Sequence, residues 1–475
     1  MEGPASAQTV SSVADLAAAA GDAGVRRIVV AGEIAEAPSL RLREGQQLVG
    51  ADDSAALVFA DGVDGVRLRR DNLVERIALR VGPARRAVFN DTTADDMGVL
   101  RLANVTTHGQ VQIVARDRAR AGQVVVEGLH IAAADTRGQA ERPHLSGVGV
   151  LQGAFTLWYL QPDGAAVLRA DLRGISAGRA GAPVRGSGVF VAGAGDSGGR
   201  LEVSRLETGP IYTDGGIAEG THDTISGGVF VVHGAHVREV RNSGPVMTYG
   251  VNDMVLDNWG RVDAWTAEAA LTSYGRSGVG FVNFGSIGVL RIAAPIETYG
   301  VGARGFNVYR LDDHAGPTVE TAEFDRVTTH ADAAVGIQVG QPIGRLIVHG
   351  GITTHGGAGD SLVRGAIVRL SAHALSIQAG GRVGSVEVHG PISSAGAGVA
   401  AVDISGEVGA MTVAGGIRAR GAGTDAIHVD GGTFSLHDTT VISADGVPIR
   451  LTDATIRELR DVRACGPVGS GSERE

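Results

Sequence analysis

The sequence predicts an all-β protein, a parallel β-helix solenoid with a short capping helix at its N-terminus. Glycine supplies 73 of the 475 residues, roughly twice its average usage, and so much glycine would destabilise helix interiors. The hydrophobic content of 43% is sufficient for a large core. Short apolar runs bounded by glycine recur in the sequence with a regular period, and that pattern is typical of stacked solenoid coils.

The N-terminal segment, residues 1–27, is predicted to hold the capping helix. Ser12 and Asp15 have the spacing of an N-terminal capping pair, and a run of alanines follows them as far as Gly21. The run Ile28–Gly32 then reads as a strand that stops at a glycine. We expect the β-helix to cover residues 28–463 and a flexible tail to cover residues 464–475.

The repeat is clearest in the second half of the chain. Tyr249, Tyr274 and Tyr299 each precede a glycine and are equally spaced, and His330 and His355 continue the series. Their spacing defines a coil of about 25 residues, which has room for two or three short strands. When such coils stack, each strand pairs in parallel with its equivalent about 4.8 Å away. About 17 coils would make a rod about 80 Å long.

Two columns of this repeat are predicted to be structural. The rings of Tyr249, Tyr274, Tyr299, His330 and His355 should stack from coil to coil. Asn258 and Asn283, which are also one period apart, should form an internal asparagine ladder that satisfies backbone groups at a turn.

Composition excludes several classes of function. All 42 basic residues are arginine, so a Walker-type phosphate loop, a Schiff-base lysine and a lysine general base are excluded. The net charge of −10 argues against a nucleic-acid partner. The single cysteine, Cys465, permits no intramolecular disulfide. No secretory signal and no apolar stretch of membrane-spanning length is visible, so we expect a soluble, cytoplasmic chain with no membrane partner, unless a leader has been removed.

A candidate binding face emerges when the coils are registered on the repeat tyrosines. Strand alternation points Met254 and Leu256, and their equivalents Val279 and Phe281, inward. It points two other columns outward. One column is of mixed character and comprises Asp257, Val282, Asn307 and Gln338. The other consists of the large aromatics Trp259, Phe284 and Tyr309. An exposed aromatic row suits stacking on a glycan or another ring-bearing small molecule. In the alternative interpretation a flanking loop covers these aromatics as a secondary core.

Two insertions interrupt the period near this face. Glu219–Asp223 precedes the regular coils, and Arg310–His314 makes its own coil longer than its neighbours. Insertions in solenoids form loops that often wall a groove. Asp312, Asp313 and His314 should therefore flank the stripe and, with Asp257, supply acid–base groups or hold a divalent cation such as Ca²⁺. The structural alternative is a solvated polar turn, and no histidine pair has metal-ligand spacing.

The start of the chain resembles the pectate-lyase-like superfamily of single-stranded right-handed parallel β-helices. The residues that carry the resemblance are the capping helix, the strand Ile28–Ile34, and the segments Gln47–Gly50 and Asp71–Val74. The resemblance implies a right-handed coil and, for most members, polysaccharide lyase, glycoside hydrolase or isomerase activity, or adhesion. The paired-aspartate and Gly-His-Gly signature of polygalacturonases is absent, and the aspartate-rich calcium pattern of pectate lyases is not clear.

Arg304 is an outlier in this register, which points it inward beside Gly305. It either lies at a coil edge and reaches outward, or the register slips by one residue there. Facing the groove, it would bind a substrate carboxylate or act as the base that the lyase resemblance implies. The structural alternative is an ion pair with a neighbouring aspartate.

The sequence thus predicts a carbohydrate-active β-helix with its site on the lateral face around residues 249–314. The expected catalytic residues are Asp257, Asp312, Asp313 and His314, and the expected ligand-binding residues are Trp259, Phe284, Tyr309, Asn307, Gln338 and Arg304. The alternative is a non-catalytic binding or assembly protein that uses the same aromatic stripe as a protein interface to another chain, for example in a homo-oligomer.

Overall fold

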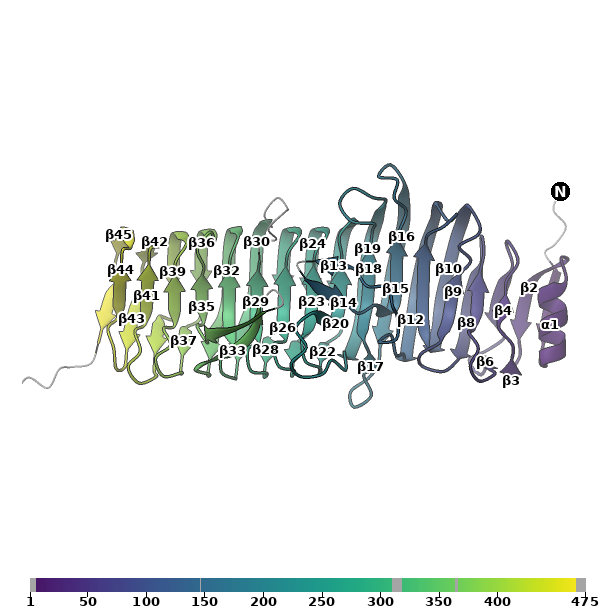
Figure 1. The fold of residues 1–475 in the computed structure, drawn as a ribbon, viewed down its shortest axis with the longest axis horizontal. Coiled ribbons are helices and arrows are strands. Elements are labelled where there is room, and N and C mark those ends of the chain that lie inside the picture. The colour runs from purple at the N-terminus through teal and green to yellow at the C-terminus, as the bar shows by residue number, and fades with distance from the viewer. Residues whose placement is uncertain (1–5, 146, 310–317, 364–365, 467–475) are drawn as a thin grey trace, which may run out of the picture.

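The fold is a parallel β-helix, as predicted, with a helix at one end (Figure 1). The computed structural model describes residues 6–145, 147–309, 318–363 and 366–466. The coils stack along one axis from the N-terminal to the C-terminal end of the rod, so that residues one coil apart in sequence are neighbours in space. No helix in these ranges is long and apolar enough to cross a lipid bilayer.

The first sheet runs the length of the rod. Its strands are β1 Ser6–Val10, β2 Val25–Val30, β3 Glu33–Ala37, β5 Gln47–Gly50, β6 Ala56–Phe59, β8 Leu73–Arg80, β10 Asp96–His108, β12 Ala121–Ala133, β16 Val167–Ala177, β17 Val184–Arg185, β19 Arg200–Asp214, β21 Ala235–Asn242, β22 Val246–Thr248, β24 Arg261–Ala267, β25 Leu271–Ser273, β27 Ser286–Ile292, β28 Ile296–Thr298, β30 Thr318–Thr329, β32 Pro342–Thr354, β36 Arg382–Val388, β37 Ile392–Ser394, β39 Glu407–Val413, β40 Ile417–Ala419, β42 Thr433–His437, β43 Thr440–Ser443, β45 Thr455–Arg460 and β46 Arg463–Cys465.

The second sheet closes the other side of the coils, and the chain also forms two hairpins, of which one pairs with this sheet through β20 (Thr224–Val231) and the other is a separate two-stranded sheet. Its strands are β4 Leu40–Arg41, β7 Val66–Leu68, β9 Arg86–Asn90, β11 Gln110–Ala115, β15 Gly153–Tyr159, β18 Ser187–Ala192, β20 Thr224–Val231, β23 Asp253–Asn258, β26 Val279–Asn283, β29 Arg304–Val308, β31 Val335–Val339, β35 Leu375–Ile377, β38 Val402–Ile404, β41 Ile427–Asp430 and β44 Ile449–Thr452. The hairpins are β13 His144–Leu145 with β14 Val148–Val150, and β33 Ala358–Val363 with β34 Ala366–Ser371.

The N-terminal cap forms where the sequence predicts it. Helix α1 spans Val13–Gly21, and the Ser12 hydroxyl accepts a hydrogen bond of 3.2 Å from the Asp15 backbone N–H. The helix buries Leu16 and Ala19 against the first coil, which closes the apolar core at this end. The N-terminal segment does more than cap, however, because β1 pairs in parallel with β2 and starts the first sheet ahead of the helix.

The aromatic column is a continuous stack, as predicted. Ring centroids lie 5.4 Å apart for Tyr249 and Tyr274, 5.1 Å for Tyr274 and Tyr299, 4.4 Å for Tyr299 and His330, and 5.3 Å for His330 and His355. Neighbouring ring planes differ by at most 13°. Because the rings cover one another's faces, the column presents edges to solvent. Stacking of a sugar ring on those inner faces is excluded.

The asparagine ladder also forms. The Nδ2 atom of Asn258 donates to Oδ1 of Asn283 at 2.7 Å, and both side chains are fully buried. Asn258 Oδ1 accepts from the Gly260 backbone N–H at 3.2 Å, and Asn283 Nδ2 donates to the Gly285 carbonyl at 3.0 Å. The two side chains therefore satisfy turn groups that would otherwise lose their partners inside the coil.

One part of the predicted register is wrong. Met254 and Val279 belong to a cluster on the outer face of the second sheet, while Val255 and Leu256 both pack into the core. The parallel ladder passes from Met254 directly to Leu256 in its pairing with the next coil. Strand alternation therefore breaks between Met254 and Leu256, and Met254 faces outward instead of inward.

Candidate functional site

The outer face of the second sheet carries the candidate site. Asp257, Val282, Asn307 and Gln338 are partners in one parallel ladder. Leu256 and Phe281, which precede the first two of them, pack into the core, so the outward direction predicted for this column is confirmed. Upstream, Phe230 is the ladder partner of Asp257.

The predicted exposure of the aromatic stripe is wrong. Trp259 is 6% exposed and Tyr309 is 9% exposed, and both belong to a second apolar cluster outside the main core. Phe284 lies between them, with ring centroids 5.8 Å from Trp259 and 5.2 Å from Tyr309. The alternative of a covered secondary core therefore describes the stripe.

Two hairpins help to cover this face (Figure 1). Val148 and Val150 of β14 and Val363 of β33 pack against the second apolar cluster. The β33–β34 hairpin is also held by polar contacts: the Ser361 hydroxyl donates to the Gly302 carbonyl at 2.7 Å. Outward-facing apolar side chains are thus hidden by chain segments that lie outside the regular repeat.

Asp257 is a buried carboxyl group in apolar surroundings. Its side chain has no measurable exposure, and neither carboxyl oxygen has a hydrogen-bond partner among the residues that the structure describes. Burial raises the pKa of Asp257 well above its ordinary value. The Trp259 indole lies close enough to oppose this increase in pKa, but its N–H has no hydrogen-bond partner among the described residues. Burial therefore favours the protonated form of Asp257 over the carboxylate.

Asp253, at the start of the same strand, is a second buried acid that the sequence analysis missed. Its Oδ2 accepts hydrogen bonds from the backbone N–H groups of Gly250 at 2.8 Å and Gly215 at 3.1 Å, while Oδ1 has no partner in the described part of the chain. Burial raises the pKa of Asp253 to about 7, and the nearby charge of Asp214 adds to the increase. The Ser226 hydroxyl lies beside the carboxyl and lowers the pKa, but it lacks the geometry of a hydrogen bond.

A signal for Asp253 was present in the repeat. The equivalent positions, three places after the repeated glycine or alanine, hold Gly278, Ala303 and Ala334 in the next coils. A carboxylate stands where neighbouring coils carry the smallest side chains. The β33–β34 hairpin had a comparable signal, because the separation of His355 from Ala395 is well over one period.

Arg304 faces outward and lies beneath the β33–β34 hairpin. It is 1% exposed, and its Nε donates to Gln338 Oε1 at 3.0 Å. Its Nη1 reaches the Leu362 carbonyl at 3.4 Å, and the guanidinium lies 5.9 Å from the centre of the Tyr309 ring. Its Nη2 has no partner within the described ranges. The outward direction agrees with the expected irregularity of the register at this position, because strand alternation breaks here, and the pairing is with glutamine instead of aspartate.

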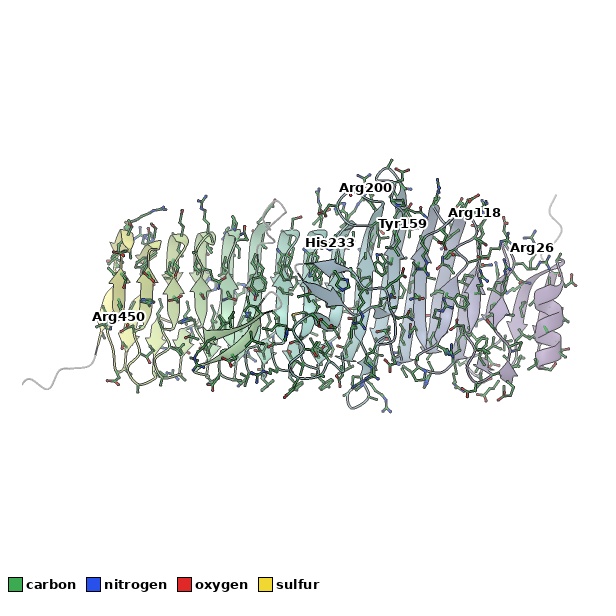
Figure 2. All side chains as sticks on the ribbon, viewed as in Figure 1. Arg26, Arg118, Tyr159, Arg200, His233 and Arg450 are labelled. Carbon is green, nitrogen blue, oxygen red and sulfur yellow. The ribbon has the colours of Figure 1, made fainter. Side chains whose placement is uncertain are left out.

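Asn307 is a further unpartnered polar group on this face. It is fully buried, and neither its Oδ1 nor its Nδ2 finds a partner among the described residues. His233 lies at the edge of the same face, with its ring packed edge-on against Trp259 at a centroid distance of 5.2 Å (Figure 2). The face therefore combines a buried carboxyl group, an amide, a guanidinium and an indole N–H.

The remaining predicted catalytic residues, Asp312, Asp313 and His314, lie outside the described residues. The other insertion, Glu219–Asp223, borders the site, because the Asn252 side chain donates to the Thr221 carbonyl at 2.7 Å. The described ranges hold no group of three His, Cys, Asp or Glu side chains arranged to bind a metal ion.

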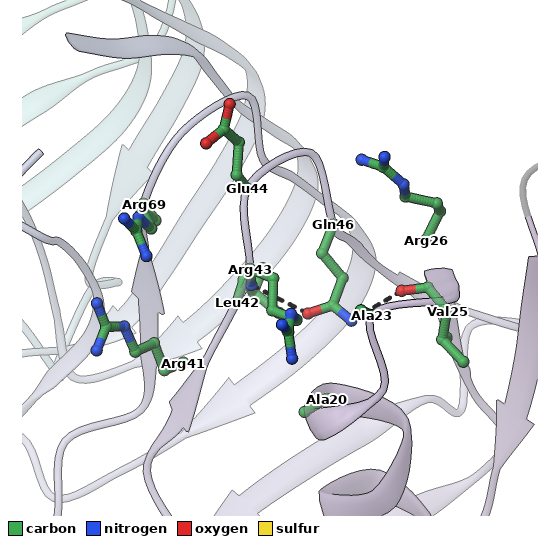
Figure 3. Close-up of a pocket in the computed structure, with 10 residues that line it drawn as sticks. All are labelled: Ala20, Ala23, Val25, Arg26, Arg41, Leu42, Arg43, Glu44, Gln46 and Arg69. Carbon is green, nitrogen blue, oxygen red and sulfur yellow. Dashed lines mark hydrogen bonds between the residues drawn. The ribbon is translucent and has the colours of Figure 1, made fainter. Parts of the chain in front are cut away.

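A basic pocket at the N-terminal end is a separate candidate (Figure 3). It has a volume of about 610 Å³ and is lined in part by Arg26, Arg41, Arg43 and Arg69. Structural roles occupy two of these: Arg43 donates to the Gly21 carbonyl at the end of α1 at 2.6 Å, and Arg41 pairs with Asp91 at 2.9 Å. The helix end carries partial negative charge, which disfavours an anion there.

The fold and the site together define a parallel β-helix with a covered polar site on its lateral face. No protein-family model, no curated protein and no solved structure matches the chain. The assignment of function therefore depends on the site alone.

Proposed function

We propose that the protein binds a glycan or a similar ring-bearing ligand on the outer face of the second sheet and cleaves or isomerises it by acid–base chemistry. The observation that carries the proposal is the buried, unpartnered carboxyl group of Asp257. Membership of the pectate-lyase-like superfamily is part of this proposal.

The energetic cost of the site supports a functional role. A buried polar group without a hydrogen-bond partner costs about 1–3 kcal/mol. Asp257, Asn307, Arg304 and Trp259 each leave at least one such atom on one face of the sheet. Native proteins tolerate few such groups, and ligand or water contacts are a common reason for their presence.

Each group has a role in the proposed reaction. Asp257, whose burial favours the protonated form, donates its proton to the oxygen of the bond that breaks. Arg304 and Asn307 bind carboxylate or hydroxyl oxygens of the ligand, and Gln338 holds Arg304 in place. Asp312, Asp313 or His314 supplies the second proton-transfer group. Trp259, Phe284 and Tyr309 contact the ring faces once the β33–β34 hairpin separates from β29.

The first test is a thermal-shift screen of the purified protein against uronic-acid oligomers, neutral glycans and Ca²⁺, followed by product analysis for any ligand that stabilises it. Asp257→Asn keeps the size of the side chain and removes the acid, so we expect retained ligand binding and loss of turnover.

The matched control is Asp403→Asn. Asp403 occupies the same outer column and accepts a hydrogen bond from His428 at 2.9 Å. The control variant should retain turnover. Equal turnover in wild type and Asp257→Asn would contradict the assignment of Asp257, and no stabilisation by any ligand class would contradict the glycan proposal.

The rival function is assembly without catalysis. The aromatic stripe is buried within the chain, so it offers little surface to another protein. Exposed apolar side chains at the C-terminal end of the rod favour assembly instead, through a surface that is distinct from the site.

A further inference from the structure

The two ends of the rod differ in whether the apolar core is covered. At the N-terminal end, α1 covers the first coil, and Leu16 and Ala19 are buried. At the C-terminal end, Leu451 and Leu459 are each 45% exposed and Val447 is 40% exposed. One coil earlier, at the equivalent positions, Val429 and Leu436 are fully buried. Core positions that are buried one coil earlier are therefore exposed in the last described coil.

The last coil also presents free strand edges. Among the described strands, β44 pairs with β41 alone, β45 with β42 and β46 with β43. Unpaired N–H and C=O groups beside apolar side chains are a template for pairing with another strand. Natural proteins cover such edges or block them, and the described residues supply no cover here.

We propose that a second copy of this chain covers this end, in a two-fold dimer in which the two β45 strands pair antiparallel. The argument for this occupant is the self-complementarity of Thr455–Arg460. In the antiparallel register that places Ile456 opposite Leu459 of the second copy, core positions meet core positions. The same register places Arg457 opposite Glu458.

The charges remain available for such a contact. Arg457 lies 3.5 Å from Glu407 and Glu458 lies 3.1 Å from His437 within the chain, but the Arg457 and Glu458 side chains are still 52% and 54% exposed. Exposed ion pairs contribute little to the stability of the fold. Exchanging these pairs within the chain for pairs across an interface therefore costs little free energy. An isologous contact of this kind closes as a dimer without further growth.

The chain's own C-terminal residues are a poorer occupant. Residues 467–475 contain Val468 as their one large aliphatic side chain. That composition offers little apolar surface to place against Leu451 and Leu459.

The test is sedimentation velocity of the full chain over a range of concentrations, with Leu459→Glu as the disrupting variant. Loss of a central interface contact raises the dimer Kd by about 30-fold or more. Val289→Glu is the matched control, because Val289 is 47% exposed on β27, away from this end. A monomeric wild type, or equal dispersal by both variants, would overturn the proposal.

A charge exchange tests the register. Glu458→Arg alone should raise the dimer Kd by about tenfold, because it places two arginines opposite each other. Adding Arg457→Glu restores an opposite pair, and the Kd should return toward that of the wild type. A double variant as weak as the single variant would overturn the register.

Two further measurements separate the occupants. A spin label on Cys465, the single cysteine, should give a short label-to-label distance if the C-terminal ends meet, whereas a lateral or N-terminal contact would not. Deleting residues 467–475 should leave the dimer Kd unchanged. Dimerisation that appears only after this deletion would assign the end to the chain's own C-terminus and overturn the proposal. None of these readouts depends on glycan binding.

Discussion

Phe230 and Asp257 are direct partners in the parallel ladder between β20 and β23, and both side chains are fully buried on the outer face. A phenyl ring and a carboxyl group thus occupy the same position of consecutive coils, and Val282 follows in the next. Apolar neighbours on both sides explain why the pKa of Asp257 is raised well above its ordinary value. They also show that an apolar side chain fits this position.

We therefore expect Asp257→Val to stabilise the fold. The substitution removes two buried oxygens that have no partner in the described ranges, and a gain of about 1–3 kcal/mol follows from the cost of such groups. Chemical denaturation of the two proteins measures the change in the free energy of unfolding. Asp403→Val should give no comparable gain, because Asp403 accepts a hydrogen bond from His428. A destabilised Asp257→Val variant would show that Asp257 has a structural partner.

The second prediction concerns Trp259, which is 6% exposed in the second apolar cluster. Trp259→Ala should cost about 3–5 kcal/mol, since truncation leaves a cavity between the sheet and its cover. Thermal and chemical denaturation would both report this loss. A loss close to zero would indicate that the cover is not packed on the stripe and that the face is an open groove.

The third prediction is a pH dependence that comes from Asp253. Its pKa is about 7 in the fold and near 3.8 in the unfolded chain, so the folded state binds the proton more tightly. Stability from this group is therefore fully present below about pH 4 and falls as the pH rises to about 7. The shift corresponds to roughly 4 kcal/mol. Asp253→Asn should thus gain stability relative to wild type as the pH rises from 4 to 8.

Asp263 provides a control of opposite sign. Burial opposes its ionisation, but the hydrogen bond from His236 and the charge of Arg261 outweigh burial and hold the pKa of Asp263 below its ordinary value. Its contribution is therefore present above the unfolded pKa and lost in acid. Asp263→Asn should lose a little stability at neutral pH. Parallel pH profiles for both variants would contradict the assignment to Asp253.

Much of the architecture could be predicted because several side chains of the repeat contact the equivalent side chain one coil away. The stack of Tyr249 and Tyr274 and the ladder of Asn258 and Asn283 require a partner one coil away, so their spacing defines the coil length. Strand alternation then placed Asp257 on the outer face. These inferences depend only on residue spacing and strand geometry, and both can be read from the sequence.

The covering of the site could not be predicted in the same way. Whether Trp259 is exposed depends on β14 and β33, which lie several coils away from it in sequence. The direction of Arg304 depends on a break in strand alternation that ladder pairing reveals and side-chain pattern does not. Long-range contacts and a local backbone irregularity were therefore the two sources of error.

The break in strand alternation explains part of the high glycine content. It also gives the last prediction. Gly280, Gly305 and Gly336 occupy the same inward position of successive coils, and a Cβ atom on Gly305 would lie 2.2 Å from Val327 Cγ1 and 2.5 Å from the Gly336 carbonyl oxygen. At Gly305 the backbone and the core therefore approach so closely that a methyl group would have to displace its neighbours. Gly305→Ala should cost about 1–3 kcal/mol by overpacking, measured as a lowered denaturation midpoint. Gly138→Ala, where a Cβ atom meets nothing within 4 Å, should change the midpoint little. If both variants unfold at the wild-type midpoint, the core beneath β29 has room for a methyl group, and the requirement for glycine lies elsewhere.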